Sequence, residues 1–198
     1  MRTIGVAVLL LVVTSLPALA QYELQFYADE AATSCELSVP APGLVKVHML
    51  VTGQGLVGGV AFKAVKPPCM ENATWISDIW QGMYAYSGNT QATVGLNNGV
   101  DVVLNCGPLP RYIGWIWFSV TGPIPSCCTY APQPGSNSPG NAYPMEIVLL
   151  DDCTPAAQTH EAPMTGRGLV INADASCACN LPVATRPSTW GAVKGLYR

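Results

Sequence analysis

Eight cysteines constrain the fold of this chain more than any other feature of its sequence. Their number is even, and they all follow an N-terminal segment with the features of an export signal, so we expect them in an oxidising compartment. We therefore expect up to four disulfides, although eight cysteines allow roughly a hundred different pairings. The eight are Cys35, Cys69, Cys106, Cys127, Cys128, Cys153, Cys177 and Cys179.

Local spacing narrows the pairing only slightly. Cys127 and Cys128 are adjacent and point to opposite faces of an extended chain, so we expect each to bond to a different partner. Cys177 and Cys179 would share one face of a strand, which also indicates two distant partners. A structural zinc site is the alternative, but such sites favour wider cysteine spacing and histidines at matching positions. The spacing found here favours disulfides.

Residues 1–20 (MRTIGVAVLLLVVTSLPALA) have the three parts of a secretory signal peptide. Arg2 supplies the positive charge, Ile4–Val13 form the apolar core, and Ala18–Ala20 fit the small-x-small cleavage rule. We expect cleavage after Ala20. Because the apolar core is shorter than the roughly 20 residues that a membrane-spanning helix needs, we expect a secreted, periplasmic or cell-surface protein with no membrane span in its mature chain.

Charged residues make up only 11% of the chain, against 49% hydrophobic residues, whereas an average soluble domain carries about a quarter charged residues. This composition excludes intrinsic disorder and helical coiled coils. A net charge of −3 disfavours nucleic acid as a partner. Removing the 20-residue leader from 198 residues leaves 178, so we expect one domain over residues 21–180 and a tail over residues 181–198.

Short segments with strand patterns recur along the chain. Residues 22–27 and 45–51 alternate apolar and polar side chains with a period of two. The run Ile113–Phe118 is apolar on both faces, which predicts a buried central strand with Trp115 and Trp117 in the core. Four glycines in residues 53–59 predict a turn. Further strands are expected at residues 60–65, 83–86, 92–96, 100–104, 145–150 and 168–172. We expect an all-β, disulfide-stapled antiparallel β-sandwich of the immunoglobulin-like or jelly-roll type.

Aromatic residues cluster in the segment TWISDIWQGMYAY. Trp75, Trp80, Tyr84 and Tyr86 lie within twelve residues of one another, beside amide and carboxylate side chains. Flat aromatic rings with neighbouring polar groups can bind a sugar, whose C–H face stacks on the ring. The alternative is that these rings cover the core beneath a sparsely charged surface.

The sequence holds no set of residues that indicates catalysis. The Gly-x-Ser-x-Gly motif of hydrolases is absent, and the two histidines are His48, within a strand pattern, and His160, within a predicted loop. A triad of His160 with Ser136 and Asp151 has no supporting spacing. We predict no catalytic residues and no cofactor.

Two acidic pairs follow predicted strands. Asp29 and Glu30 follow the first strand, while Asp151 and Asp152 follow a later one and precede Cys153. Pairs at strand ends usually face solvent or cap a turn. Asp151 and Asp152 are the candidate metal ligands, because a disulfide at Cys153 would hold their carboxylates in place.

The last residues differ in character from the rest. Two prolines make residues 181–187 an extended connector, and a short amphipathic helix is expected to follow. Such a helix is too short to be stable alone, so it either attaches to a partner or frays. The candidate attachment residues are Trp190, Val193, Leu196 and Tyr197.

Several segments carry a family resemblance. Residues 27–35 (YADEAATSC), the strand at residues 46–51 and the ending at residues 189–198 (TWGAVKGLYR) resemble uncharacterised exported proteins of environmental bacteria, in which one β-sandwich follows a signal peptide. The order of the strands, with the glycine-led segment Val57–Phe62 (VGGVAF), resembles cohesin-type sandwich modules. The resemblance implies an extracytoplasmic sandwich and transfers no catalytic residue.

These observations predict a secreted or cell-surface, non-enzymatic β-sandwich protein with a structural, adhesive or interaction role. Its expected partner is a protein or a glycan at the cell surface, and the oligomeric state stays open. A carbohydrate-binding module that uses the aromatic cluster is the alternative. An extracellular hydrolase ranks third, because no acid–base or nucleophile set is present.

Overall fold

The computed structural model describes residues 22–39, 41–92, 98–135, 146–151, 153 and 162–179. Within these ranges the chain forms twelve β-strands and one short 3₁₀ helix, so the all-β prediction is confirmed. No helix in this part of the chain is long and apolar enough to span a membrane. The elements are β1 (Tyr22–Tyr27), β2 (Glu36–Leu37), β3 (Gly43–Gly53), β4 (Leu56–Phe62), η1 (Pro68–Met70), β5 (Ala73–Trp80), β6 (Met83–Gly88), β7 (Val100–Pro108), β8 (Arg111–Val120), β9 (Cys128–Tyr130), β10 (Ile147–Asp151), β11 (Ala162–Arg167) and β12 (Leu169–Ile171).

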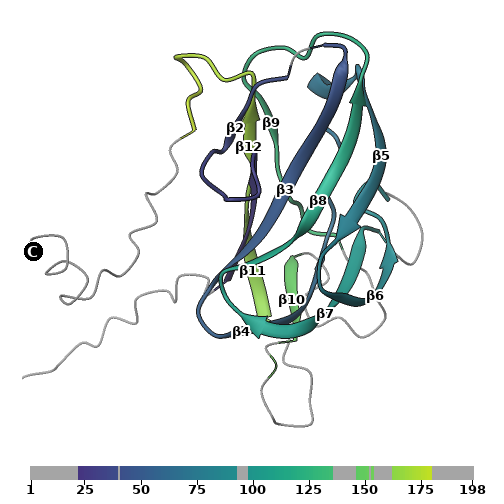
Figure 1. Cartoon of the computed structure of the whole chain (residues 1–198), viewed down its shortest axis with the longest axis vertical. Helices are drawn as coiled ribbons and strands as arrows, with labels where there is room; N and C mark the ends of the chain where they lie inside the picture. The colour runs from purple at the N-terminus through teal and green to yellow at the C-terminus, as the bar shows by residue number, and fades with distance from the viewer. Residues whose placement is uncertain are drawn as a thin grey trace, which may run out of the picture.

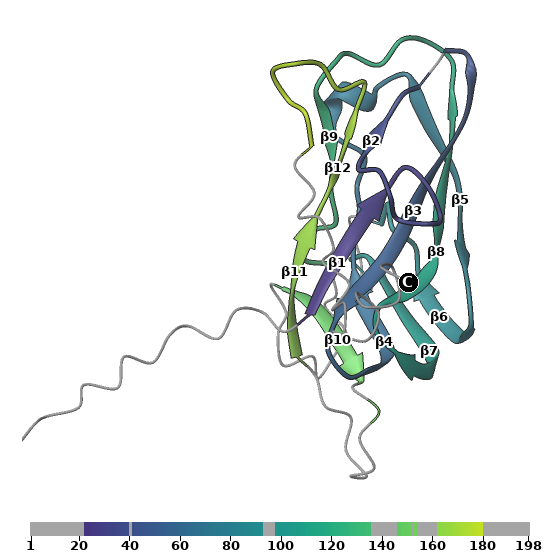
Figure 2. The same cartoon turned by 60° about the vertical axis from the view of Figure 1, so that its left-hand side comes forward.

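The strands form one large and one small sheet. The large sheet has the order β5-β8-β3-β1-β11-β10-β4-β7-β6, and the small sheet has the order β2-β12-β9. Neighbouring strands are antiparallel except for the pairs β1–β11 and β2–β12, which are parallel. The small sheet lies at the end of the molecule opposite to β4, β6 and β7 (Figures 1 and 2).

The large sheet folds back on itself to make a sandwich. Strands β4 and β5 are six positions apart in the sheet order, which would separate them by about 28 Å in a flat sheet. However, Phe62 of β4 and Trp80 of β5 pack edge to face with their ring centroids 6.2 Å apart. The two halves of the sheet therefore face each other, as the sequence predicts. Strands β5 and β6 form the two edges of the large sheet.

Aromatic rings fill the space between the layers. Phe26 of β1 contacts Phe62, and both Phe26 and Phe118 of β8 contact Tyr130 of β9. Tyr130 is fully buried, and its hydroxyl donates a hydrogen bond of 2.6 Å to the carbonyl oxygen of Ala64. The small sheet thus packs on the same core as the large one.

All eight cysteines form disulfides, as predicted, and none is left as a thiol. Cys127 and Cys128 have different partners, and so do Cys177 and Cys179, which confirms both expectations from local spacing. The four bonds hold together segments that lie 47 to 144 residues apart in the sequence. The pairs are Cys35–Cys179, Cys69–Cys128, Cys106–Cys153 and Cys127–Cys177.

Several local expectations need correction. The predicted turn at residues 53–59 ends earlier, since β4 begins at Leu56 and includes Gly59. A Cβ at Gly59 would lie 2.9 Å from the carbonyl oxygen of Val102, so this glycine serves close strand packing rather than a turn. Strands β2, β5, β9 and β11 were not predicted, because they are short or contain proline, glycine or an irregular pattern. Most of the predicted strand at residues 92–96 lies outside the described residues.

Candidate functional site

The aromatic cluster predicted from the sequence lies on two strands. Trp75 and Trp80 of β5 pack against the core, and the Trp75 indole Nε1 donates a 3.0 Å hydrogen bond to the Asp78 carboxylate. Tyr84 and Tyr86 of β6 are 77% and 57% exposed. The two tryptophans are partly buried against the core and the two tyrosines are exposed, so the four rings do not form one exposed surface.

A different aromatic surface lies on the outer face of β3 and β8. Trp115 and Trp117 are only half-buried, so the prediction that they belong to the core is wrong. The inward positions of this strand are taken instead by fully buried residues such as Ile116 and Phe118. We call the surface the outer-face patch; it consists of Leu44, Lys46 and His48 from β3 and Tyr112, Trp115 and Trp117 from β8.

An irregularity in β8 places its aromatic residues on one face. The pairing of β3 with β8 shifts between Met49, which lies opposite Gly114, and Leu50, which lies opposite Tyr112. Gly114 has a φ of 137°, a conformation that side-chain-bearing residues rarely adopt. Strict alternation would put Tyr112 and Trp115 on opposite faces, because they are three residues apart. The bulge restores them to the same face.

The side chains of the outer-face patch form a continuous row. The His48 Nδ1 lies 2.8 Å from the Tyr112 hydroxyl, and the His48 ring lies 6.3 Å from the Trp115 ring. The ammonium of Lys46 lies 4.9 Å from the ring centroid of Trp115 and 5.2 Å from that of Trp117. These distances define cation–π contacts, each worth about 0.5–1 kcal/mol at an exposed site. These contacts connect the side chains of β3 and β8 into one row.

Charged loop residues act on one end of this row. Burial lowers the pKa of His48, with a smaller contribution from Lys46, while Glu30 and Asp29 oppose the shift. Burial also raises the pKa of Tyr112, with help from Glu30. Asp29 itself keeps its charge: partial burial opposes ionisation, but hydrogen bonds from Thr33 and Ser34 hold its pKa below the usual range. The row is therefore neutral at His48 and Tyr112 at pH 7, with negative charge beside it.

The shifted pKa of His48 predicts a pH dependence of stability. Because the folded protein binds the histidine proton less readily than the unfolded chain, stability is full above the ordinary pKa of 6.5 and decreases as the pH falls below it. We expect the urea midpoint to fall over this range in the native chain and to fall less in His48→Gln. Equal slopes for both proteins would contradict the prediction. The lowered pKa of Asp29 affects stability in a separate pH range, because its contribution is lost as the pH falls near and below the ordinary value of 3.8.

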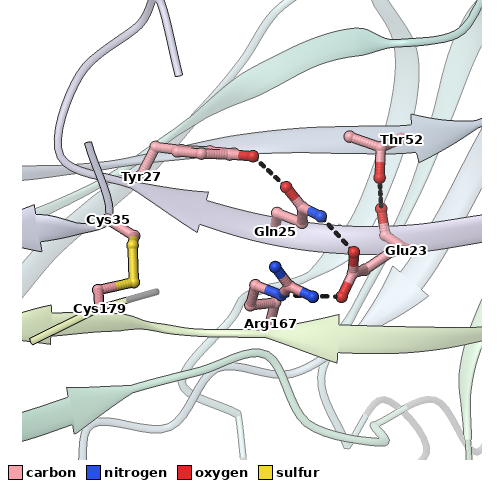
Figure 3. A network of polar contacts seen from close by, with 7 residues as sticks. All are labelled: Glu23, Gln25, Tyr27, Cys35, Thr52, Arg167 and Cys179. Atoms are coloured by element: carbon pink, nitrogen blue, oxygen red, sulfur yellow. Dashed lines mark hydrogen bonds and ion pairs between the residues drawn. A yellow bond between two sulfur atoms is a disulfide. The ribbon is translucent and has the colours of Figure 1, made fainter. Parts of the chain in front are cut away.

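A polar network lies next to the patch on β1, as Figure 3 shows. The Tyr27 hydroxyl donates to the Gln25 amide oxygen, and the Gln25 amide nitrogen donates to the Glu23 carboxylate. Glu23 in turn pairs with Arg167 of β11, with 3.2 Å between the carboxylate oxygen and the guanidinium Nε. Burial raises the pKa of Tyr27, so its hydroxyl keeps its proton and remains a hydrogen-bond donor. The network therefore links the side chains of the parallel pair β1–β11.

The candidate metal ligands do not form a described site. The side chain of Asp151 and the whole of Asp152 lie outside the described residues, as do the tail residues Trp190, Val193, Leu196 and Tyr197. A second group, Cys127, Asp174 and Cys177, brings three possible ligand atoms within 4.8 Å of one another. Its two sulfur atoms form a disulfide, which leaves one carboxylate and no ligand set for a metal.

No protein-family model and no curated protein sequence matches this chain. Among solved structures, it is similar to a chain in the crystal structure of a complex of a CaDoc0917 variant with CaCohA2 at pH 5.5, with 9% identity, a TM-score of 0.48, and coverage of 76% of this chain and 99% of the other. It is also similar to the seventh ScaB type I cohesin from Pseudobacteroides cellulosolvens, with 10% identity, a TM-score of 0.43, and coverage of 82% and 99%. These similarities concern the fold alone.

Proposed function

We propose that this chain is an exported, non-enzymatic interaction protein that binds a protein partner through the outer-face patch. The observation that carries the proposal is the position of Trp115 and Trp117 on a sheet face that no described layer covers. Tryptophan and tyrosine dominate the energetic centres of protein interfaces. Leu44, which is 68% exposed, adds apolar area at one end of the same row.

Lys46 favours a protein partner over a sugar at this patch. A pyranose stacks on a free aromatic face, but the Lys46 ammonium lies over both tryptophan rings. A protein partner can contact the ring edges and the lysine stem together, because interfaces combine apolar contact with charge pairing at their rim. The patch therefore has the chemistry of a protein contact.

Export and a non-enzymatic role complete the proposal. The predicted signal peptide at residues 1–20 and the four disulfides support an oxidising, extracytoplasmic location. Within the described ranges, His48 contacts Tyr112 rather than a nucleophile, and every cysteine sulfur is bonded to another. Nothing in this arrangement supports acyl transfer or hydrolysis.

A pair of double variants tests the proposal. The native chain is used to capture a protein from the medium and envelope of the producing cells, and the dissociation constant is then measured with that protein in purified form. We expect Trp115→Ala/Trp117→Ala to weaken binding about 30-fold, the effect of losing a roughly 2 kcal/mol interface centre. The matched control is Tyr84→Ala/Tyr86→Ala, which removes two exposed rings elsewhere and should leave the constant unchanged. Equal affinity of all three proteins would overturn the proposal.

Glycan binding through β6 is the second candidate function. Tyr84 and Tyr86 are the exposed members of the predicted aromatic cluster, and β6 is an edge strand with every residue exposed. A glycan array on the native chain tests this function, which requires binding that is lost in Tyr84→Ala and kept in Trp117→Ala. Trp80→Ala is a poor probe, since Trp80 packs on Phe62 and its loss would disturb the core.

A further inference from the structure

Charge is distributed very unevenly along this chain. Residues 181–198 contain Arg186, Lys194 and Arg198 and no acidic residue. Residues 21–180 contain five lysines and arginines against twelve acidic residues, which gives a net charge of −7. The tail and the sandwich are therefore electrostatically complementary.

The described chain ends near β1, the strand that pairs with β3 of the outer-face patch. Cys179 is bonded to Cys35, and its backbone N–H donates a 2.9 Å hydrogen bond to the Glu36 carboxylate. Ala28 follows Tyr27 at the end of β1, and its backbone N–H donates a 2.8 Å hydrogen bond to the carbonyl oxygen of Ser34, the residue before Cys35. Tyr27 pairs with His48 of the patch. Strand β1 is two positions from β8 in the sheet, a distance of about 10 Å. The segment that follows Cys179 thus starts within a short reach of the row of aromatic rings.

The segment after Cys179 is long enough to reach the outer-face patch. Nineteen residues follow Cys179, and an extended chain of that length spans about 60 Å. A segment tethered so close to a surface has an effective concentration in the millimolar range. This effective concentration is higher than the concentration of the protein in an ordinary solution. The patch therefore binds the segment of its own chain in preference to the segment of a second copy.

The chemistry of the segment matches the patch and its border. Trp190, Val193, Leu196 and Tyr197 supply apolar side chains that suit the exposed Leu44 and the half-buried tryptophans. The cations of the segment suit Glu30 and Asp29, which act on His48 from the loop between β1 and β2. Glu30 is exposed, so a cation can reach its carboxylate.

We infer that residues 180–198 dock on the outer-face patch of the same chain and cover it until a partner displaces them. This inference rests on the proposed function, because it assigns the segment as a regulator of that binding surface. It accounts for an aromatic face without a covering layer and for a cationic segment attached beside it. Covering the face also protects the exported protein from unspecific contacts.

Limited trypsin digestion of the native mature chain at low salt tests the inference, with mass spectrometry to follow cleavage after Lys194. We expect cleavage to become at least tenfold faster in Trp117→Ala, in Glu30→Lys and in 1 M salt, which screens the charge pairing. Glu30→Lys alters an exposed loop residue and keeps the test valid if Trp117→Ala misfolds. The matched control, Tyr84→Ala, should cleave at the native rate.

Equal cleavage rates in the native chain and both variants would overturn the inference. Protection that disappears on tenfold dilution would also overturn it, since the segment would then lie on a second copy. The two proposals fail separately. If partner binding depends on Trp117 while cleavage after Lys194 does not, docking of the segment is wrong and the proposed function stands. If cleavage depends on Trp117 but partner binding does not, the proposed function is wrong.

Discussion

Gly114→Ala is expected to lower the free energy of unfolding by about 3–5 kcal/mol, as measured by urea denaturation. Gly114 adopts a φ of 137° in the middle of β8, and a Cβ there would lie 2.0 Å from the carbonyl oxygen of Ile79 and 3.0 Å from the Cα of Trp80. Both neighbours belong to the backbone of β5, so no side-chain rotation relieves the contact. Either β5 separates from β8 or the bulge is lost.

Gly55→Ala is the matched control, because it separates backbone strain from collision. Gly55 has a φ of 103°, but a Cβ there would meet nothing closer than the Tyr22 hydroxyl at 3.8 Å. We expect this variant to lose only the strain contribution, about 1–3 kcal/mol. If the two variants lose equal stability, close contact with β5 contributes nothing and our explanation of the bulge is wrong.

The same glycine links the fold to the candidate site. Its bulge aligns Tyr112 with Trp115 and Trp117, so any Gly114→Ala molecules that remain folded should bind the partner more weakly than the native chain. A loss of stability with unchanged affinity would show that the row of rings forms without the bulge.

Regular alternation explains what the sequence could predict. Strands β1 and β3 follow the period of two closely, since Leu24, Phe26, Val47 and Met49 all point inward and are fully or almost fully buried. The disulfide framework was predictable as well, because only the number and compartment of the cysteines were needed. The pairing itself was not, since it depends on which loops the two sheets bring together.

Bulges explain much of what the sequence could not predict. A register shift between Trp75 and Ser77 changes the phase of β5, so Trp75, Asp78 and Trp80 share the inner face despite their irregular spacing. Nearness in sequence also misleads, because the strands before and after the tight turn that follows Trp80 differ in burial. The two tryptophans pack against the core, whereas Tyr84 and Tyr86 are exposed.

The outer-face patch was missed for a different reason. A run that is apolar on both faces predicts burial on both faces, but in this molecule no described layer covers the outer side of β3 and β8. Recognising the site also requires Lys46 and His48, which come from a strand more than sixty residues earlier and meet Trp117 and Trp115 only through the strand register. Such pairing is not visible in either segment alone.

Removing the Cys35–Cys179 disulfide should lower the stability of the protein strongly. The bond joins residues 144 apart in sequence. However, the Cys69–Cys128 and Cys127–Cys177 bonds shorten the loop that it closes to roughly 40 residues. Closing a loop of that length restricts the unfolded chain by about 4 kcal/mol in the chain-entropy model. We expect Cys35→Ser/Cys179→Ser to lower the free energy of unfolding by about this amount, which is close to the whole stability of a marginal domain. Urea denaturation without reductant measures it.

Cys106→Ser/Cys153→Ser is the control, since this bond joins residues 47 apart, closes a loop of similar length and should also contribute about 4 kcal/mol. If the two variants differ in stability by more than about 2 kcal/mol, loop length does not determine the contribution of these bonds. The first variant has a second expected consequence, because Cys35 and Cys179 join the segment before β2 to the segment after β12 and fix the point from which residues 180–198 start. Cleavage after Lys194 should therefore accelerate in Cys35→Ser/Cys179→Ser and stay at the native rate in the control, under conditions where both variants remain folded. Equal acceleration in both would mean that general loosening, rather than release of this anchor, exposes the segment.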